Sequence, residues 1–89
     1  MLKLVYLRQF EKDLAKAIKR NKDIEKLKVL ITIICEEKVL PAKNRNHKLR
    51  GDYNGYWECH IEPDWLLIYK KTDTELILVR LGTHADLFE

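Results

Sequence analysis

The sequence contains little glycine, proline or cysteine and has no long apolar run. Three glycines and two prolines are too few for a fibrous or low-complexity protein, and 46% hydrophobic residues exclude intrinsic disorder. No apolar stretch approaches the roughly 18–20 residues of a membrane-spanning helix, and residues 1–6 predict a strand rather than a signal peptide. Two cysteines with no short motif between them are typical of a reduced cytosolic protein. We therefore expect one cytoplasmic domain over residues 1–89.

Charge is divided unevenly along the chain. Residues 1–50 carry 14 Lys and Arg against 6 Asp and Glu, and residues 51–89 carry 3 against 8, so balances of +8 and −5 lie within the net +3. The first half therefore predicts a surface for a polyanion, although a solvated, lysine-rich helix pair is the simpler interpretation. All three histidines lie in or beside the acidic half, where proton transfer could take place.

Hydrophobic periodicity predicts a strand and then two helices in the first half. The apolar run 4–7 is too short for a helix and predicts a strand. After it, one helical stripe is formed by Phe10, Leu14, Ala17 and Ile18. Asp23 is a candidate N-cap of a second helix, but the β-branched run 29–34 would also suit a buried strand. The length of the periodic stretch favours the helix.

The second half predicts a meander of strands. A basic loop at 41–46 and a short extended piece at 47–50 precede strands at 56–61, 65–71 and 75–81. Short turns join antiparallel neighbours, and Thr83 is a candidate cap of a last helical turn. The expected fold is α+β with two layers. An N-terminal strand and two helices pack on a mainly antiparallel sheet of four to five strands, and a short helical turn ends the chain.

The predicted strand ends bring together groups suited to acid–base chemistry. His60 ends one strand, Asp64 lies in the following turn, and His84 follows the last strand. His47 enters from the short extended piece, and Arg80 lies near the end of the last strand, on the face opposite its two neighbours. Cleavage of a phosphodiester needs one group to accept the ribose 2′-OH proton and another to protonate the 5′-oxygen. A guanidinium would offset charge on the phosphorane.

Each of these residues also has an ordinary structural interpretation. A histidine on a strand is commonly a half-buried structural residue, Asp64 suits a turn, and Arg80 could pair with Glu58 across the sheet. Zinc is the competing chemistry, but no pair has the short ligand spacing that usually anchors a zinc site. We therefore expect metal-free catalysis without a cofactor. Trp65 and Phe88 flank the expected site and could contact a base.

Two sequence blocks resemble a known family. Residues 58–65 (ECHIEPDW) and 80–88 (RLGTHADLF) closely resemble the YafQ branch of the RelE/ParE toxin superfamily, and residues 47–51 (HKLRG) fit the same branch. The resemblance covers nearly the whole chain. It implies a RelE-like fold and a type II toxin, a ribosome-dependent mRNA endoribonuclease. Such a toxin cuts the codon displayed in the A site, and a cognate antitoxin neutralises it.

The resemblance also implies roles for individual residues. The catalytic set of the branch corresponds to His47, His60, Asp64 and His84. It implies that His84 is the general acid, that His60 and Asp64 are the base and its orienting or charge-stabilising partner, and that His47 assists at the phosphate. The positions that contact the substrate, at a phosphate or a base, correspond to Arg80, Phe88 and Trp65.

The same resemblance implies binding partners for the basic first half of the chain. On the 70S ribosome, rRNA phosphates would meet Lys12, Lys16, Lys19, Arg20, Lys43, Arg45, Lys48 and Arg50. An acidic, partly disordered antitoxin similar to DinJ or RelB would compete for these surfaces, and operator DNA would be bound only through that complex. No membrane partner is expected. The alternative is a ParE-like inhibitor that binds an enzyme such as gyrase without cutting RNA, but a pure binder has no use for the histidines.

Overall fold

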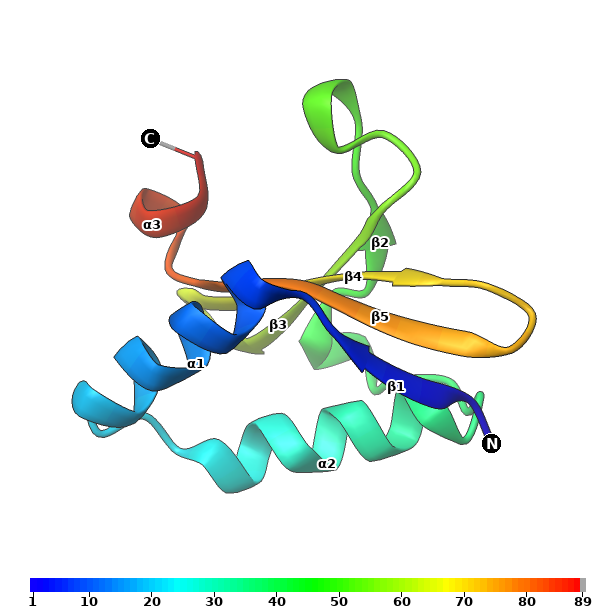
Figure 1. Ribbon diagram of the computed structural model, residues 1–89, viewed down its shortest axis with the longest axis horizontal. Helices are drawn as coiled ribbons and strands as arrows, with labels where there is room; N and C mark the ends of the chain where they lie inside the picture. Colours follow the sequence, from blue (N-terminus) through cyan, green and yellow to red (C-terminus); the bar gives the residue numbers. More distant parts are fainter. Residues whose placement is uncertain (89) are drawn as a thin grey trace.

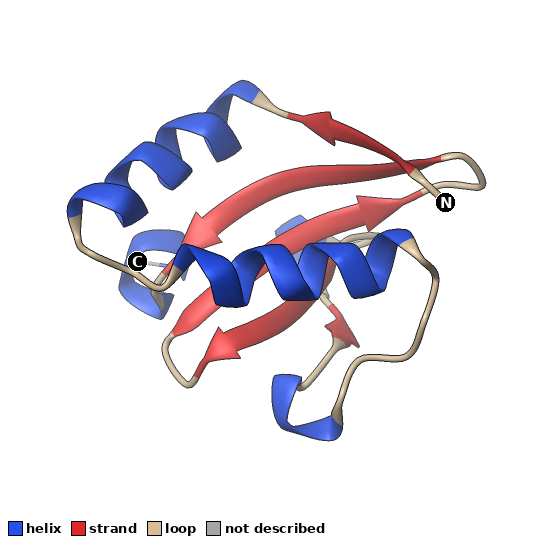
Figure 2. Cartoon of the chain, turned by 90° about the horizontal axis from the view of Figure 1, so that it is seen from below, coloured by secondary structure: helices blue, strands red, loops and turns tan. Residues whose placement is uncertain are grey.

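Five strands form one sheet, with two long helices on one face and a short helix on the other (Figure 1; Figure 2). The computed structural model describes residues 1–88, so Glu89 of the expected domain lies outside the described residues. In chain order the elements are β1 (Lys3–Tyr6), α1 (Arg8–Lys19), α2 (Ile24–Cys35), the 3₁₀ turn η1 (Ala42–Asn44), β2 (His47–Lys48), the 3₁₀ turn η2 (Gly51–Tyr53), β3 (Trp57–Glu62), β4 (Trp65–Lys71), β5 (Glu75–Gly82) and α3 (His84–Phe88).

The strand order is β1-β5-β4-β3-β2. β1 runs parallel to β5, and every other pair of neighbours is antiparallel. The predicted meander is therefore confirmed, and the N-terminal strand extends it at the β5 edge. None of the helices within residues 1–88 is long and apolar enough to cross a membrane.

The helices form where the periodicity predicts them, with one error in the buried stripe of α1. The Asp23 side chain caps α2 by accepting a hydrogen bond from the Lys26 N–H at 3.4 Å, and the β-branched run is helical. In α1, Ile18 is 56% exposed, so its predicted burial is wrong. Asp13 takes its place in the buried stripe, one turn after Phe10 and one turn before Ala17.

The core lies on both faces of the sheet. The larger cluster packs α1 and α2 against β3, β4 and β5, and the smaller one packs Leu87 of α3 against the opposite face. Residues 65–69 of β4 are all buried because this central strand is covered on both faces. Trp65 is 1% exposed and faces the helices, so the expectation that it contacts a base is wrong.

A β-bulge breaks the alternation of β5. Ile68 of β4 pairs with Arg80, and the next residue, Tyr69, pairs with Leu78, so Val79 is an additional residue in β5. Val79 and Ile68 pack in the same small cluster, and Arg80 lies opposite Ile68 in the register. Arg80 is therefore not on the face opposite Val79, as simple alternation predicts. Arg80 does point to the other face of the sheet from Leu81, which belongs to the larger cluster.

Candidate active site

The three histidines meet at one end of the sheet. His60 belongs to β3, His84 begins α3, and His47 belongs to the edge strand β2. The ring centroids of His60 and His84 are 5.8 Å apart, and those of His47 and His60 are 6.3 Å apart. The structure thus brings together the histidines that the strand ends predict, and a carboxylate lies beside each of them.

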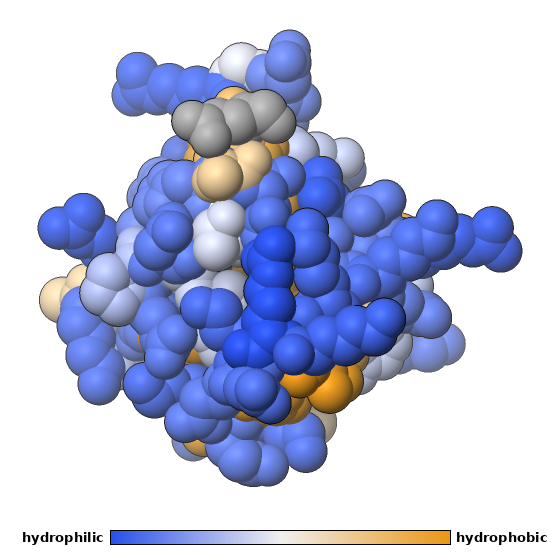
Figure 3. Space-filling view, turned by 90° about the vertical axis from the view of Figure 1, so that its left-hand side faces the viewer, coloured by the Kyte–Doolittle hydropathy of each residue, from blue (hydrophilic) through white to orange (hydrophobic). Residues whose placement is uncertain are grey.

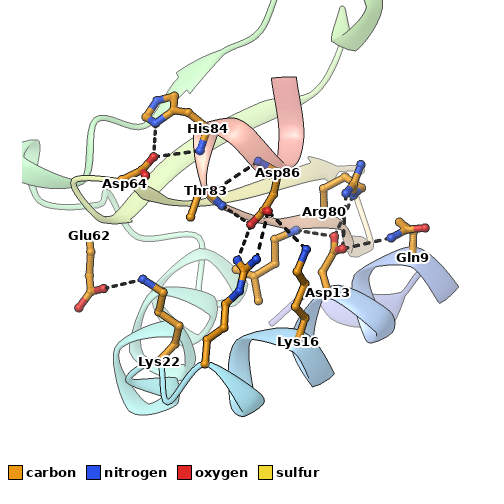
Figure 4. A network of polar contacts seen from close by, with 12 residues as sticks. Gln9, Asp13, Lys16, Lys22, Glu62, Asp64, Arg80, Thr83, His84 and Asp86 are labelled. Carbon is orange, nitrogen blue, oxygen red and sulfur yellow. Dashed lines mark hydrogen bonds and ion pairs between the residues drawn. The ribbon is translucent and has the colours of Figure 1, made fainter. Parts of the chain in front are cut away.

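Asp64 holds His84. One carboxylate oxygen lies 2.5 Å from His84 Nδ1 and accepts the His84 backbone N–H at 2.9 Å (Figure 4). The pKa of Asp64 is held below its usual range by hydrogen bonds from His84. The largest contribution comes from the backbone N–H and the next from the ring. The ionised carboxylate keeps a proton on Nδ1, so Nε2 is the ring atom left to exchange a proton with a substrate.

Glu58 is a site residue that the sequence interpretation missed. Its carboxylate is buried, and one oxygen lies 3.4 Å from Nε2 of His47 and 3.4 Å from Nε2 of His60. The carboxylate in contact with His60 is therefore Glu58, and Asp64, the expected partner of His60, contacts His84 instead. The alternation of β3 places Glu58 and His60 on one face, which was the signal available.

The basic loop before β2 is a scaffold for two of the histidines. Asn44 is buried, and its Nδ2 donates to the His60 carbonyl at 2.8 Å. The Arg45 carbonyl lies 2.6 Å from His47 Nδ1, and Asn46 accepts a hydrogen bond from the Tyr69 hydroxyl at 2.6 Å. β2 pairs only with the first two residues of β3. Beyond the end of this edge strand, the loop lies beside His60 and supplies the hydrogen bond to its backbone.

Arg80 pairs with Asp13 and not with Glu58. Its Nε donates to Asp13 at 2.8 Å, and the Leu81 N–H donates to the same carboxylate at 3.0 Å. β1 pairs with β5 only as far as Leu78, so the remainder of β5 is open to the Asp13 side chain of α1. The hydrogen bond that Arg80 donates to Asp13 raises the pKa of Arg80, and Tyr53 adds to this effect.

Phe88 presents an aromatic ring beside His84. It is half exposed, and its ring centroid lies 6.4 Å from that of His84 and 5.8 Å, edge-on, from that of Tyr53. Tyr53 was not among the predicted site residues. It connects Phe88 with the surroundings of Arg80, and its position in η2 gives no periodic signal by which it could have been found.

The eight basic residues predicted to contact rRNA divide into two groups. Within residues 1–88, six of these eight have no ion pair: Lys12, Lys19, Lys43, Arg45, Lys48 and Arg50. Two others, Lys16 and Arg20, are paired with Asp86 of α3. Figure 3 looks onto the end of the molecule that carries α3 and the α1–α2 connection, and hydrophilic side chains cover most of it.

A groove runs from His60 along α2. Its volume is about 1040 Å³, and it lies between α2, the η1 loop and the end of β3. His60 and Asp64 line one end, Val29 and Ile33 give it an apolar wall, and Lys43 stands at its rim. Within residues 1–88, no group of three or more His, Cys, Asp and Glu side chains could hold a metal ion.

Comparison with known proteins gives concordant matches. The family model "Bacterial toxin of type II toxin-antitoxin system, YafQ" matches residues 2–89. The mRNA interferase toxin YafQ of Escherichia coli K12 is 49% identical over 84 residues, which cover 93% of this chain and 91% of that protein. In the crystal structure of the E. coli DinJ–YafQ complex, the matching chain is 46% identical with a TM-score of 0.92, over 99% of this chain and 98% of that one. A metal-bound toxin from Helicobacter pylori is 36% identical with a TM-score of 0.93, over 99% of this chain and 100% of that one.

Proposed function

Because the chain belongs to the YafQ family of bacterial toxins of type II toxin–antitoxin systems, we propose that it cuts mRNA codons in the ribosomal A site. The chain is an endoribonuclease of the mRNA interferase kind, and the proposal adds the dependence on the ribosome and the mechanism. One observation supports the mechanism. The ring centroids of His60 and His84 lie 5.8 Å apart, and the two rings contact different carboxylates, Glu58 and Asp64.

The two histidines divide the proton transfers. His60, beside Glu58, accepts the proton of the ribose 2′-OH while the 2′-oxygen attacks phosphorus. The bond from phosphorus to the 5′-oxygen breaks, and Nε2 of His84 protonates that oxygen, which leaves a 2′,3′-cyclic phosphate and a 5′-hydroxyl. Asp64 stabilises the cationic His84 before it gives up its proton, because the carboxylate stays ionised.

Other residues stabilise the phosphate and the base. His47 lies beside His60 and faces Glu58 through Nε2, so a cationic His47 ring can stabilise the charged phosphorane. Arg80, held by Asp13, adds positive charge on the Tyr53 side of the site. Phe88 offers an exposed ring for stacking on a base.

The ribosome and an antitoxin are the proposed macromolecular partners. The six predicted rRNA contacts that have no ion pair within residues 1–88 are available for rRNA phosphates, which give affinity without sequence preference. The structure of the E. coli DinJ–YafQ complex supports an antitoxin similar to DinJ as the second partner. Operator DNA would be bound only through that antitoxin complex.

Cleavage on programmed ribosomes tests the proposal. The purified protein is first treated with EDTA and desalted, or left untreated, and is then incubated with a short mRNA and 70S ribosomes in buffer that contains Mg²⁺; the cuts are mapped by primer extension. We expect the same cuts in the A-site codon from the treated and the untreated protein, and much slower cleavage of the same RNA without ribosomes. Equally fast cutting of free RNA would contradict the dependence on the ribosome. Loss of cutting by the EDTA-treated protein, restored when a transition metal is added back, would instead indicate metal chemistry, which the metal-bound H. pylori toxin makes the relevant alternative.

A further inference from the structure

Helix α3 carries two of the proposed reacting and contacting side chains but is too short to be stable by itself. It comprises only the five residues His84–Phe88, and isolated helices shorter than about 12 residues are marginal in water. The positions of His84 and Phe88 therefore depend on the contacts that hold α3 to the rest of the molecule.

Asp86 makes most of the polar contacts of α3. Its carboxylate accepts the Thr83 N–H at 3.0 Å, and the Thr83 hydroxyl accepts the Asp86 N–H at 3.1 Å, so the two residues form a capping box. The same carboxylate accepts from Arg20 Nη1 at 2.8 Å and lies 3.4 Å from Lys16 Nζ (Figure 4). The hydrogen bond from Arg20 is the largest of the contacts that lower the pKa of Asp86 far below its usual range.

The packing under α3 leaves little freedom for another orientation. A Cβ at Gly82 would lie 2.8 Å from the Asp86 Cβ and 3.3 Å from a Leu87 methyl group, so α3 packs directly on the backbone at the end of β5. Leu87 is buried in the smaller core cluster. Rotation of α3 about this contact is opposed on the α1 side by Arg20 and on the turn side by the hydrogen bond that the His84 N–H donates to Asp64.

We propose that Arg20 is a positioning residue, which fixes α3 through Asp86 and so orients His84 and Phe88 toward the RNA. The inference rests on the proposed cleavage on the ribosome. α1 contributes no proposed reacting group, yet Arg20 connects its C-terminal end to the helix that begins with His84. Lys16 makes a longer contact with the same carboxylate and has the lesser part. The competing assignment is the one from family resemblance, in which Arg20 contacts rRNA.

Steady-state cleavage of mRNA on programmed ribosomes separates the two assignments. In Arg20→Gln we expect kcat to fall about tenfold, because small displacements of a reacting group are costly, while KM for the ribosome–mRNA complex changes less than about twofold. Arg20→Lys should regain most of the loss because it restores a charged donor. Asp86→Asn should lower kcat similarly, and the double variant should add little, because both changes break one contact.

Two controls and a spectroscopic measurement accompany the kinetics. Lys38→Gln removes an exposed ion pair of the same kind, with Glu36, and should leave kcat and KM as in the wild type. Lys19→Gln removes a neighbouring charge of α1 and should raise KM instead. The histidine ring signals of the protein in NMR should change at His84 in Arg20→Gln and remain unchanged at His47, which a general loss of stability would not produce.

The inference is overturned if Arg20→Gln raises KM and leaves kcat unchanged, since that is the result for an rRNA contact. If Arg20→Gln is partly unfolded in thermal melts, Arg20→Lys and Asp86→Asn take its place. A kcat equal to that of the wild type in both of these variants would also overturn the inference. If the wild type cuts free RNA as fast as ribosome-bound RNA, the proposed function fails. In that case kcat on free RNA still tests Arg20.

Discussion

Two histidine–carboxylate groups stand side by side in this site, and they differ in burial. Asp64 and His84 expose 65% and 54% of their side chains, whereas Glu58, between His47 and His60, exposes 7% of its own. An exposed pair is screened by water and contributes little to stability, but its ring is accessible to a substrate. A buried carboxylate is costly to leave without its partners, so it holds its neighbours in place. Both groups supply a histidine to the proposed chemistry. The comparison predicts that only the buried group also contributes strongly to the stability of the fold.

The largest expected effect comes from the exposed ring. His84→Gln should lower kcat on programmed ribosomes by at least about 100-fold, because a general acid contributes about 10²–10⁴. The thermal unfolding midpoint should change little, since the side chain is more than half exposed. Ribosome pelleting measures whether binding is retained. A variant that still cuts at the wild-type rate would remove His84 from the role of acid.

Replacing the buried carboxylate tests the other half of the comparison. Glu58→Gln keeps the shape but weakens the contacts with His47 and His60, so we expect a loss of about 1–3 kcal/mol in the free energy of unfolding. Cleavage should fall about tenfold, because His60 loses the group that orients it. Urea unfolding and cleavage on programmed ribosomes measure the two effects. An unfolding curve equal to that of the wild type would show that burial of Glu58 does not determine the stability of this end of the sheet.

The thiol next to Glu58 reports on the same strand. Cys59 is fully buried, and burial raises its pKa to about 12, so the wild type should react only slowly with a thiol reagent at neutral pH. Glu58→Gln should speed the labelling of Cys59 in the folded protein because local opening of β3 becomes less costly. Asp64→Asn is the matched control, since Asp64 lies in a turn outside β3, and it should label at the wild-type rate. Mass spectrometry of the labelled peptides distinguishes Cys59 from Cys35.

The elements were predictable from the sequence because their signals are local. The helical stripe of α1, the Asp23 cap and the alternation in β3 depend on neighbouring residues. The carboxylate partners were not predictable in the same way. Asp13 meets Arg80 across 67 positions of sequence, and that contact depends on where β1 stops pairing and on the bulge at Val79. The burial of Trp65 likewise depends on both faces of β4 being covered, which the residues of β4 alone do not reveal.

The smallest expected effect is the contribution of the exposed pair to stability as a function of pH. The folded-state pKa of Asp64 is lowered by its bonds from His84, so the ionised carboxylate stabilises the fold. This contribution is fully present above the unfolded pKa of about 3.9 and is lost as the pH falls through the lower folded value. Wild type and Asp64→Asn should therefore differ by a small amount in urea unfolding at pH 5, and the difference should shrink toward pH 2. If the difference in the free energy of unfolding instead grew on acidification, His84 would stabilise the protonated carboxyl of Asp64. The exposed pair would then not be the weak, water-screened ion pair that distinguishes it from the buried Glu58.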